Sequence, residues 1–158
     1  MKRKWESIRR WIVFQNIKKV LLEKDVWHEI KSHEPVYTSE QAARARKVAL
    51  RTGVKAMVLK GNTYFLVLIR ADKKVDFKLI KKLEMSNRVR LASPEEVKEQ
   101  TGCETGSVPP FGFARDFKTY LDKEILKEGK VNFNAGLHTK SIVMMGKDLL
   151  KVVEPVVF

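Results

Sequence analysis

At residues 54–70 the chain reads "VKAMVLKGNTYFLVLIR", which is two apolar segments separated by a short polar one. β-Branched and aromatic residues are frequent in both segments, and the "GNT" between them is short and contains glycine. This pattern predicts two antiparallel strands joined by a hairpin. The sequence therefore indicates antiparallel β structure near the middle of the chain.

One residue of the hairpin is unusual for a purely structural strand. Lys55 is flanked by Val54 and Ala56 and is followed by Met57 and Val58. Strand alternation places Met57 on the same face as Lys55, so the amine is expected against a partly apolar wall. A charged donor in such a place would attract an anion or a polarised carbonyl, because a low dielectric strengthens the interaction. The alternative is an outward-facing, solvated lysine.

Helix and strand signals continue on both sides of the hairpin. Thr38 with Gln41, and Ser93 with Glu96, form capping-box patterns that start two helices. Further helices are predicted around residues 17–21, 76–84, 123–128 and 147–153, and further strands at 26–31, 88–92, 118–122, 130–136, 141–145 and 155–158. Together they predict a single α+β (mixed α/β) domain, a distorted, largely antiparallel β-barrel or sheet surrounded by helices.

The charge balance points to a polyanionic partner. The 158 residues include 32 Lys+Arg and 19 Asp+Glu, which gives a net charge of +13. A field of this sign favours nucleic acid, although a protein can also be basic without such a partner. Apolar runs are too short to cross a bilayer, and the single cysteine, Cys103, is typical of a reducing cytoplasm. We therefore expect a cytoplasmic protein without a membrane segment.

Familiar catalytic motifs are absent from the sequence. The histidines His28, His33 and His138 have neither an HExxH pattern nor cysteine partners, so no metal is expected, and no phosphate-binding glycine motif predicts a cofactor. Cys103 lacks a recognisable histidine motif and is a weak candidate nucleophile. Two glycine-containing loops remain, "GSVPPFG" (106–112) and "NAGLHT" (134–139). Their backbone N–H groups could bind a carbonyl or phosphate oxygen, or the loops could be plain turns.

Several segments together resemble a known family. They are "HEPVYTSEQAARAR", "TGVKAMVLKG", "DFKLIKKL", "RLASPEEVKEQTGCETGSVPPFG" and "NAGLHTKSIVM". In this order and spacing they resemble the YbaK/prolyl-tRNA-synthetase-associated aminoacyl-tRNA editing domains, from about Asn16 to the C-terminus. The resemblance implies a barrel-like α/β domain that hydrolyses the ester of a mischarged tRNA. Because no synthetase domain is attached, it implies a stand-alone deacylase acting in trans.

The resemblance also implies a site. Lys55 is the implied catalytic residue, holding the terminal phosphate or the ester region, and water is the expected nucleophile. The implied substrate-binding residues are Gly106, Ser107, Val108, Pro109 and Pro110 in one loop, and Ala135, Gly136, Leu137, His138 and Thr139 in the other. The prolines are expected to stiffen a pocket wall. His138 is expected either to orient the substrate or to be a bystander.

The N-terminal segment lies outside the resemblance. We expect a basic helical arm at residues 1–15, followed by the editing domain at residues 16–158. Lys2, Arg3, Lys4, Arg9 and Arg10 are predicted to meet tRNA phosphates. The expected partners are aminoacyl-tRNA carrying alanine, serine, threonine or cysteine, and a synthetase as a candidate. The alternatives are a non-catalytic tRNA- or nucleic-acid-binding protein of the same fold, and a hydrolase of other small acyl esters.

Overall fold

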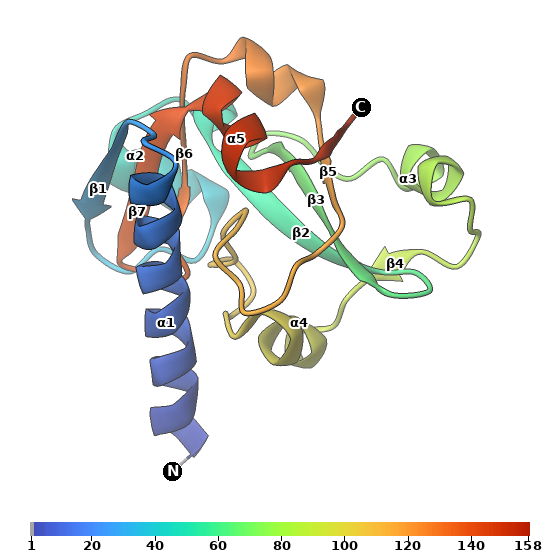
Figure 1. Ribbon diagram of the computed structural model, residues 1–158, viewed down its shortest axis with the longest axis horizontal. Coiled ribbons are helices and arrows are strands. Elements are labelled where there is room, and N and C mark those ends of the chain that lie inside the picture. The colour runs from blue at the N-terminus through green and yellow to red at the C-terminus, as the bar shows by residue number, and fades with distance from the viewer. Residues whose placement is uncertain (1) are drawn as a thin grey trace.

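The computed structural model describes the backbone of residues 2–158 and the side chains of residues 4–158. Helices surround two β-sheets (Figure 1). The helices are α1 (Lys2–Glu23), α2 (Ser39–Arg46), α3 (Phe77–Glu84), α4 (Pro94–Thr101) and α5 (Leu149–Val153), with short 3₁₀ helices η1 (Leu50–Thr52), η2 (Lys123–Lys127) and η3 (Gly146–Asp148). The strands are β1 (His28–Ser32), β2 (Val54–Lys60), β3 (Tyr64–Arg70), β4 (Arg90–Leu91), β5 (Thr119–Leu121), β6 (Lys130–Asn134), β7 (Lys140–Met145) and β8 (Val156–Val157). The predicted α+β class is confirmed.

The strands form a five-stranded and a three-stranded sheet. Their orders are β4-β2-β3-β5-β8 and β1-β7-β6. Pairing is antiparallel except between β3 and β5 and between β5 and β8. A single isolated bridge, Gly53 to Asn132, connects the two sheets. The largely antiparallel prediction is therefore confirmed, but the distorted sheets do not close into a barrel.

The predicted hairpin is at the centre of the larger sheet. β2 and β3 pair from Val54 with Arg70 to Lys60 with Tyr64. Alternate residues of β3 enter two separate cores, with Leu66 and Leu68 on one face and Phe65, Val67 and Ile69 on the other. The second core includes Ile80 of α3, which covers that face. Because both faces are buried, β3 is a continuous apolar run instead of an alternating pattern.

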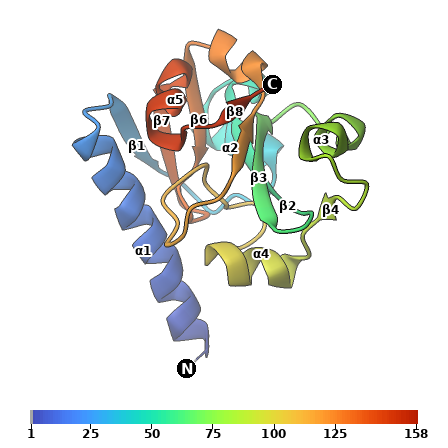
Figure 2. The same cartoon turned by 45° about the vertical axis from the view of Figure 1, so that its right-hand side comes forward.

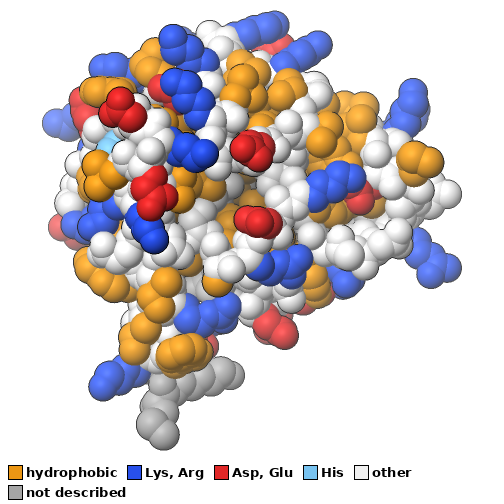
Figure 3. All heavy atoms as spheres, viewed as in Figure 1, with side chains coloured by type: hydrophobic (Ala, Val, Ile, Leu, Met, Phe, Trp, Pro, Cys, Tyr) orange, Lys and Arg blue, Asp and Glu red, His pale blue; other side chains and the backbone are white. Residues whose placement is uncertain are grey.

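Helix α1 is one long helix that extends beyond the body of the molecule at its N-terminal end (Figures 1 and 2). Its C-terminal part packs Val13, Phe14, Ile17 and Leu21 into the larger core. The expected boundary between residues 15 and 16 thus falls inside a continuous helix. The N-terminal half of α1 exposes four large apolar side chains, Trp5, Ile8, Trp11 and Ile12. Figure 3 shows hydrophobic side chains gathered near this end of the molecule. Among the described residues, no helix has the length and apolar character needed to cross a membrane.

Both capping boxes are confirmed. The Thr38 hydroxyl accepts from the Gln41 N–H while the Gln41 side chain accepts from the Thr38 N–H, and Ser93 and Glu96 do the same at α4. At its other end, α4 finishes on Gly102 with φ 75°. These caps fix where α2 starts and where α4 starts and ends, shortly before the Gly/Pro loop.

Gly112 allows that loop to lie directly on α1. Its φ is +102°, and its carbonyl accepts a 3.0 Å hydrogen bond from the Asn16 amide. A Cβ at this position would be 2.6 Å from Ile17 Cγ1 and 3.1 Å from the Val13 carbonyl oxygen. Pro109 and Pro110, just before it, are both buried. The loop is therefore packed against the core.

We expect Gly112→Ala to destabilise the protein by at least about 2 kcal/mol. Left-handed backbone costs an alanine about 1–2 kcal/mol, and overpacking in a core typically costs about 1–3 kcal/mol. Urea unfolding monitored by tryptophan fluorescence measures the change. Gly129→Ala is the matched control, because a Cβ there has nothing within 4 Å. Equal stability of the two variants would show that the loop does not depend on this contact.

Candidate active site

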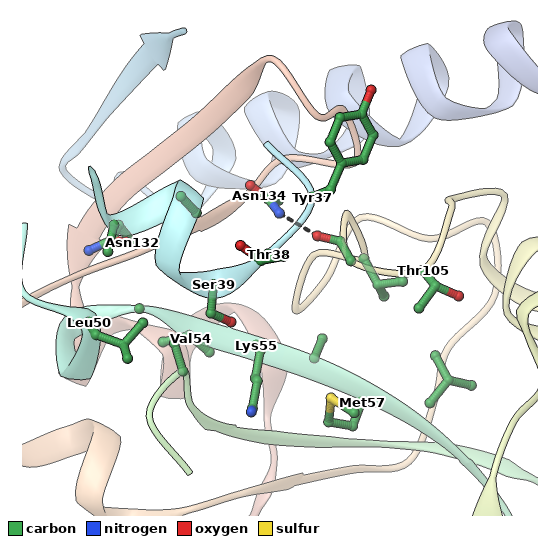
Figure 4. A pocket seen from close by; sticks show the side chains of 18 of the residues that line it. Tyr37, Thr38, Ser39, Leu50, Val54, Lys55, Met57, Thr105, Asn132 and Asn134 are labelled. Atoms are coloured by element: carbon green, nitrogen blue, oxygen red, sulfur yellow. Dashed lines mark hydrogen bonds between the residues drawn. The ribbon is translucent and has the colours of Figure 1, made fainter. Parts of the chain in front are cut away.

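A cavity of about 280 Å³ lies in the gap between the two sheets. Strand β4 pairs with β2 only at Leu59 and Lys60, so the start of β2 has a free edge. The cavity lies along this edge, and α2, the loop at residues 105–108 and β6 form its other walls (Figure 4). Gly53 and Asn132, which bridge the sheets, are both part of the lining. The unpaired edge of β2 therefore borders a cavity that can hold a small ligand.

Lys55 lines this cavity and has no neutralising partner. It is half-buried, and among the described residues no hydrogen bond or ion pair reaches its amine. Burial lowers the pKa of Lys55, and the more distant charges of Glu40 and Asp72 oppose that shift. Met57 is partly buried against the smaller core. Figure 4 shows the side chains of Lys55 and Met57 projecting from β2. The ammonium is therefore available to a ligand.

The lining combines an apolar floor with several polar groups. Its apolar members include Ala42, Val54, Ala56, Val58, Val97 and Val108. Thr38 and Ser39 contribute hydroxyls from the start of α2, and Asn132 and Asn134 contribute amides from β6 (Figure 4). The Ser39 hydroxyl has no hydrogen-bond partner among the described residues. The cavity can therefore enclose a small acyl group and also bond to a polar one.

The predicted "GSVPP" loop contributes Gly106 and Val108 to the lining. Gly106 has φ +89°, and a Cβ on it would be 3.1 Å from the Tyr37 carbonyl oxygen. Its own carbonyl accepts a 2.5 Å hydrogen bond from the Asn134 amide (Figure 4). Ser107 is buried, and both its N–H and its hydroxyl donate to the Glu104 carbonyl. The turn is therefore fixed, and the Gly106 N–H has no acceptor within the described part of the chain.

Residues 135–139 of the second predicted loop lie outside the cavity lining, and Gly136 packs against α1. Ala135 is fully buried in the core and Leu137 packs on it. Gly136, with φ +86°, would place a Cβ 3.2 Å from Val13 and 3.5 Å from the Cys103 sulfur. Thr139 is exposed. Substrate contacts by this loop remain a prediction. The close packing against Val13 and Cys103 is enough to explain why residue 136 is a glycine.

His138 connects that loop to the mouth of the cavity. Its Nδ1 lies 2.9 Å from the Val36 carbonyl oxygen, and its Nε2 lies 3.0 Å from a Glu104 carboxylate oxygen. Both ring nitrogens of His138 thus face oxygen atoms of neighbouring residues. The bond from His138 lowers the pKa of Glu104, and the ring stacks on Tyr37 with centroids 4.5 Å apart.

The arginines of the N-terminal arm have partners within the molecule. Arg9 donates to the carbonyls of Lys98 and Glu99 at the end of α4, and Arg10 forms a 3.0 Å ion pair with Glu104. Lys4 is exposed. The side chains of Lys2 and Arg3 lie outside the described residues. Arg10 thus connects α1, through Glu104, to the histidine at the cavity mouth.

Arg46 is a site residue that the sequence reasoning missed. It lines the cavity at 7% exposure and donates to three side chains of the smaller sheet, Ser141, Asn132 and Asn134. Its one sequence signal is its position four residues after Ala42, on the buried face of α2.

The remaining candidates for chemistry lie outside the cavity lining. Cys103 is fully buried, and this burial raises the pKa of its thiol to about 12. A thiol in that state is a poor nucleophile. Within the described part of the chain, no three histidine, cysteine, aspartate or glutamate side chains gather as metal ligands would.

Comparisons of the sequence with known proteins relate this chain to aminoacyl-tRNA editing domains. Residues 33–152 match the family model described as the aminoacyl-tRNA editing domain. A multifunctional Ser/Thr-tRNA deacylase, ProXp-y of Escherichia coli K12, is 31% identical over 156 residues, covering 95% of this chain and 93% of that protein. The proline–tRNA ligase of Bacillus subtilis is 35% identical over 108 residues, 67% of this chain and 19% of the ligase.

A solved structure shares the fold. It is described as a proposed trans-editing enzyme for prolyl-tRNA synthetase, and it covers 92% of this chain and 94% of its own at a TM-score of 0.82 with 24% sequence identity. The family model spans most of the chain, and the alignment with the deacylase relative covers 95% of it. The chain belongs to the aminoacyl-tRNA editing domain family.

Proposed function

We propose that this protein is a stand-alone deacylase that acts in trans on tRNA mischarged with a small hydroxylated amino acid, serine or threonine. The observation that carries the proposal is the half-buried ammonium of Lys55, which lines the cavity without a partner. A strand lysine in an apolar environment gains little for stability, because its charge is costly to desolvate. An electron-rich substrate group would supply the missing partner.

The reaction is hydrolysis of an ester. Water attacks the carbonyl carbon, the bond from that carbon to the ribose oxygen breaks, and the products are the free amino acid and the tRNA hydroxyl. Negative charge develops on the carbonyl oxygen, where positioned donors are most effective. The Lys55 ammonium and the Gly106 N–H are the two free donors proposed for this task. The nucleophile is water, because Cys103 is buried away from the cavity.

The polar lining supports a preference for serine and threonine. A site that hydrogen-bonds a substrate hydroxyl discriminates strongly against an analogue lacking it, whereas an apolar pocket discriminates weakly. The Ser39 hydroxyl has no partner among the residues that the structure describes, and the Thr38 hydroxyl, which accepts at the helix cap, can still donate. The relative ProXp-y is named as a Ser/Thr-tRNA deacylase, which agrees with this preference.

We expect purified protein, at substoichiometric concentration, to hydrolyse Ser-tRNA and Thr-tRNA faster than Ala-tRNA or Cys-tRNA. The measurement is loss of labelled amino acid from each charged tRNA. Binding without turnover would support the non-catalytic alternative. Equal rates on the tRNA and on a minimal aminoacyl ester would support a general esterase.

Lys55→Ala should reduce kcat/KM for deacylation at least about tenfold, which corresponds to roughly 1.4 kcal/mol, with little change in unfolding free energy. Lys55→Arg should not restore activity, because the planar guanidinium cannot replace a compact ammonium in a small cavity. Lys60→Ala is the matched control on the same strand, since Lys60 is outside the cavity lining and its amine lies over the Tyr64 ring. Wild-type activity of Lys55→Ala would place the chemistry elsewhere.

For the tRNA body, we propose contacts along α1. The helix is joined through Arg10 and Glu104 to His138 at the cavity mouth, so a tRNA whose end enters the cavity would pass close to it. Lys4 and Lys19 are exposed on this helix, with Lys19 in a long 3.9 Å ion pair with Glu23 at the surface, whereas Arg9 and Arg10 bond to residues at and just after the end of α4. A synthetase is a candidate partner, because the similar ligase carries such a domain within its own chain.

Replacing Lys4 and Lys19 with glutamine should weaken tRNA binding and flatten its salt dependence. Each lost phosphate contact reduces the slope of log K against log salt by about 0.7–0.9. Fluorescence anisotropy at several salt concentrations measures this slope. Lys78, Lys81 and Lys82 on α3, replaced in the same way, form the comparison. A slope that changes only in the α3 variant would place the tRNA on that helix.

A further inference from the structure

Arg46 is held by three side chains that bear no charge. Its Nε donates to the Ser141 hydroxyl at 2.7 Å, Nη1 to Asn132 Oδ1 at 2.9 Å, and Nη2 to Asn134 Oδ1 at 2.5 Å. No carboxylate pairs with it among the described residues. Each nitrogen therefore has one acceptor, whereas a guanidinium carries five N–H groups.

The charge on Arg46 persists despite this burial. Desolvation lowers its pKa to about 10, which leaves the guanidinium protonated at neutral pH. A buried cation without a counter-charge is costly, and replacing it with apolar side chains often stabilises a protein. Its position in the wall of the cavity therefore suggests a purpose other than stability.

Asn134 gives Arg46 a connection to the glycine loop. One end of the amide, Oδ1, accepts from Arg46, and the other end, Nδ2, donates to the Gly106 carbonyl at 2.5 Å (Figure 4). Because Oδ1 accepts from a cation, the amide cannot flip without placing its NH₂ group against the guanidinium. Arg46 therefore fixes which end of Asn134 faces Gly106.

The Gly106 carbonyl and the Gly106 N–H belong to one short turn. The carbonyl shares its rigid peptide plane with the Ser107 N–H, so the bonds from Asn134 and to Glu104 anchor the same plane. The Gly106 N–H belongs to the preceding plane, which is joined to this one at the Gly106 Cα. Gly106 has φ +89° and is exposed, and the two Ser107 bonds hold the turn only to Glu104, a few residues away in the same loop. The Asn134 bond connects the Gly106 turn to β6, on the opposite wall of the cavity.

We propose that Arg46 is a positioning residue for deacylation: through Asn134 it holds the Gly106 turn with its free N–H directed at the substrate carbonyl. The inference deepens the proposed function and rests on it. Arg46 touches no reacting atom in this account. Its effect reaches the substrate through the amide and the loop.

Asn134→Asp separates this role from a structural one. The carboxylate still accepts from Arg46 and supplies a counter-charge, but it has no N–H for the Gly106 carbonyl. If Arg46 is only structural, this variant should be as stable as the wild type or more so, and fully active. We expect the urea midpoint to be kept or raised while kcat on Ser-tRNA falls at least about tenfold, with a smaller change in KM.

Ser141→Ala is the matched control. It removes the Nε acceptor of Arg46 and leaves the bond from Asn134 to Gly106 in place, and Ser141 is not part of the cavity lining. We expect this variant to lose stability while kcat stays close to the wild-type value. Arg46→Lys should lose kcat, because an ammonium cannot reproduce the planar fork that holds both asparagines.

Amide hydrogen exchange provides a readout independent of catalysis. In Asn134→Asp, and not in Ser141→Ala, the amide of Ser107, which is protected by its bond to the Glu104 carbonyl, should exchange faster. If this amide is loosened and kcat is unchanged, or if both variants lose kcat equally with the amide unchanged, the positioning role is wrong. If the wild type has no deacylase activity, the proposed function fails, and the exchange data then test the loop-holding role alone.

Discussion

The buried guanidinium of Arg46 is the constraint on which the site geometry depends. It connects α2 to β6 and β7 through bonds that span 95, 86 and 88 residues of sequence. Asn132 extends the same network to Thr52, beside the bridge that joins the two sheets. A buried cation with only neutral acceptors must keep all of them, because a lost bond leaves a charged donor in a low dielectric. The walls of the cavity are therefore held in fixed relation to one another.

The cavity exists because the start of β2 has an unpaired edge, and the Arg46 network holds the walls of this cavity in place. A closed barrel would pair that edge with a strand and fill the gap, whereas in the described part of the chain backbone pairing joins the two sheets only at Gly53 and Asn132. Two cations, Lys55 and Arg46, line the same cavity, and no described carboxylate pairs with either of them. Their combined field favours a substrate group that carries or develops negative charge. An ester carbonyl at its transition state is such a group.

Local signals in the sequence predicted much of the fold. The hairpin and both capping boxes depend on residues a few positions apart, which is why the sequence predicted them correctly. Arg46, Asn132 and Asn134 could not be predicted in this way, because their contacts join distant parts of the chain. The loop containing Gly136 shows the opposite difficulty. Gly136 permits close packing on α1. A glycine that packs closely and a glycine that binds a ligand cannot be told apart from the sequence alone.

The central claim is that the cavity bounded by β2 and the Gly106 loop receives the aminoacyl end of tRNA. A crystal structure with a non-hydrolysable seryl-adenosine amide tests it most directly. The account predicts the seryl group in this cavity, with its carbonyl oxygen within hydrogen-bond distance of the Lys55 ammonium or the Gly106 N–H. An analogue bound elsewhere, for example in the second cavity lined by Phe111 and Phe113, would contradict it.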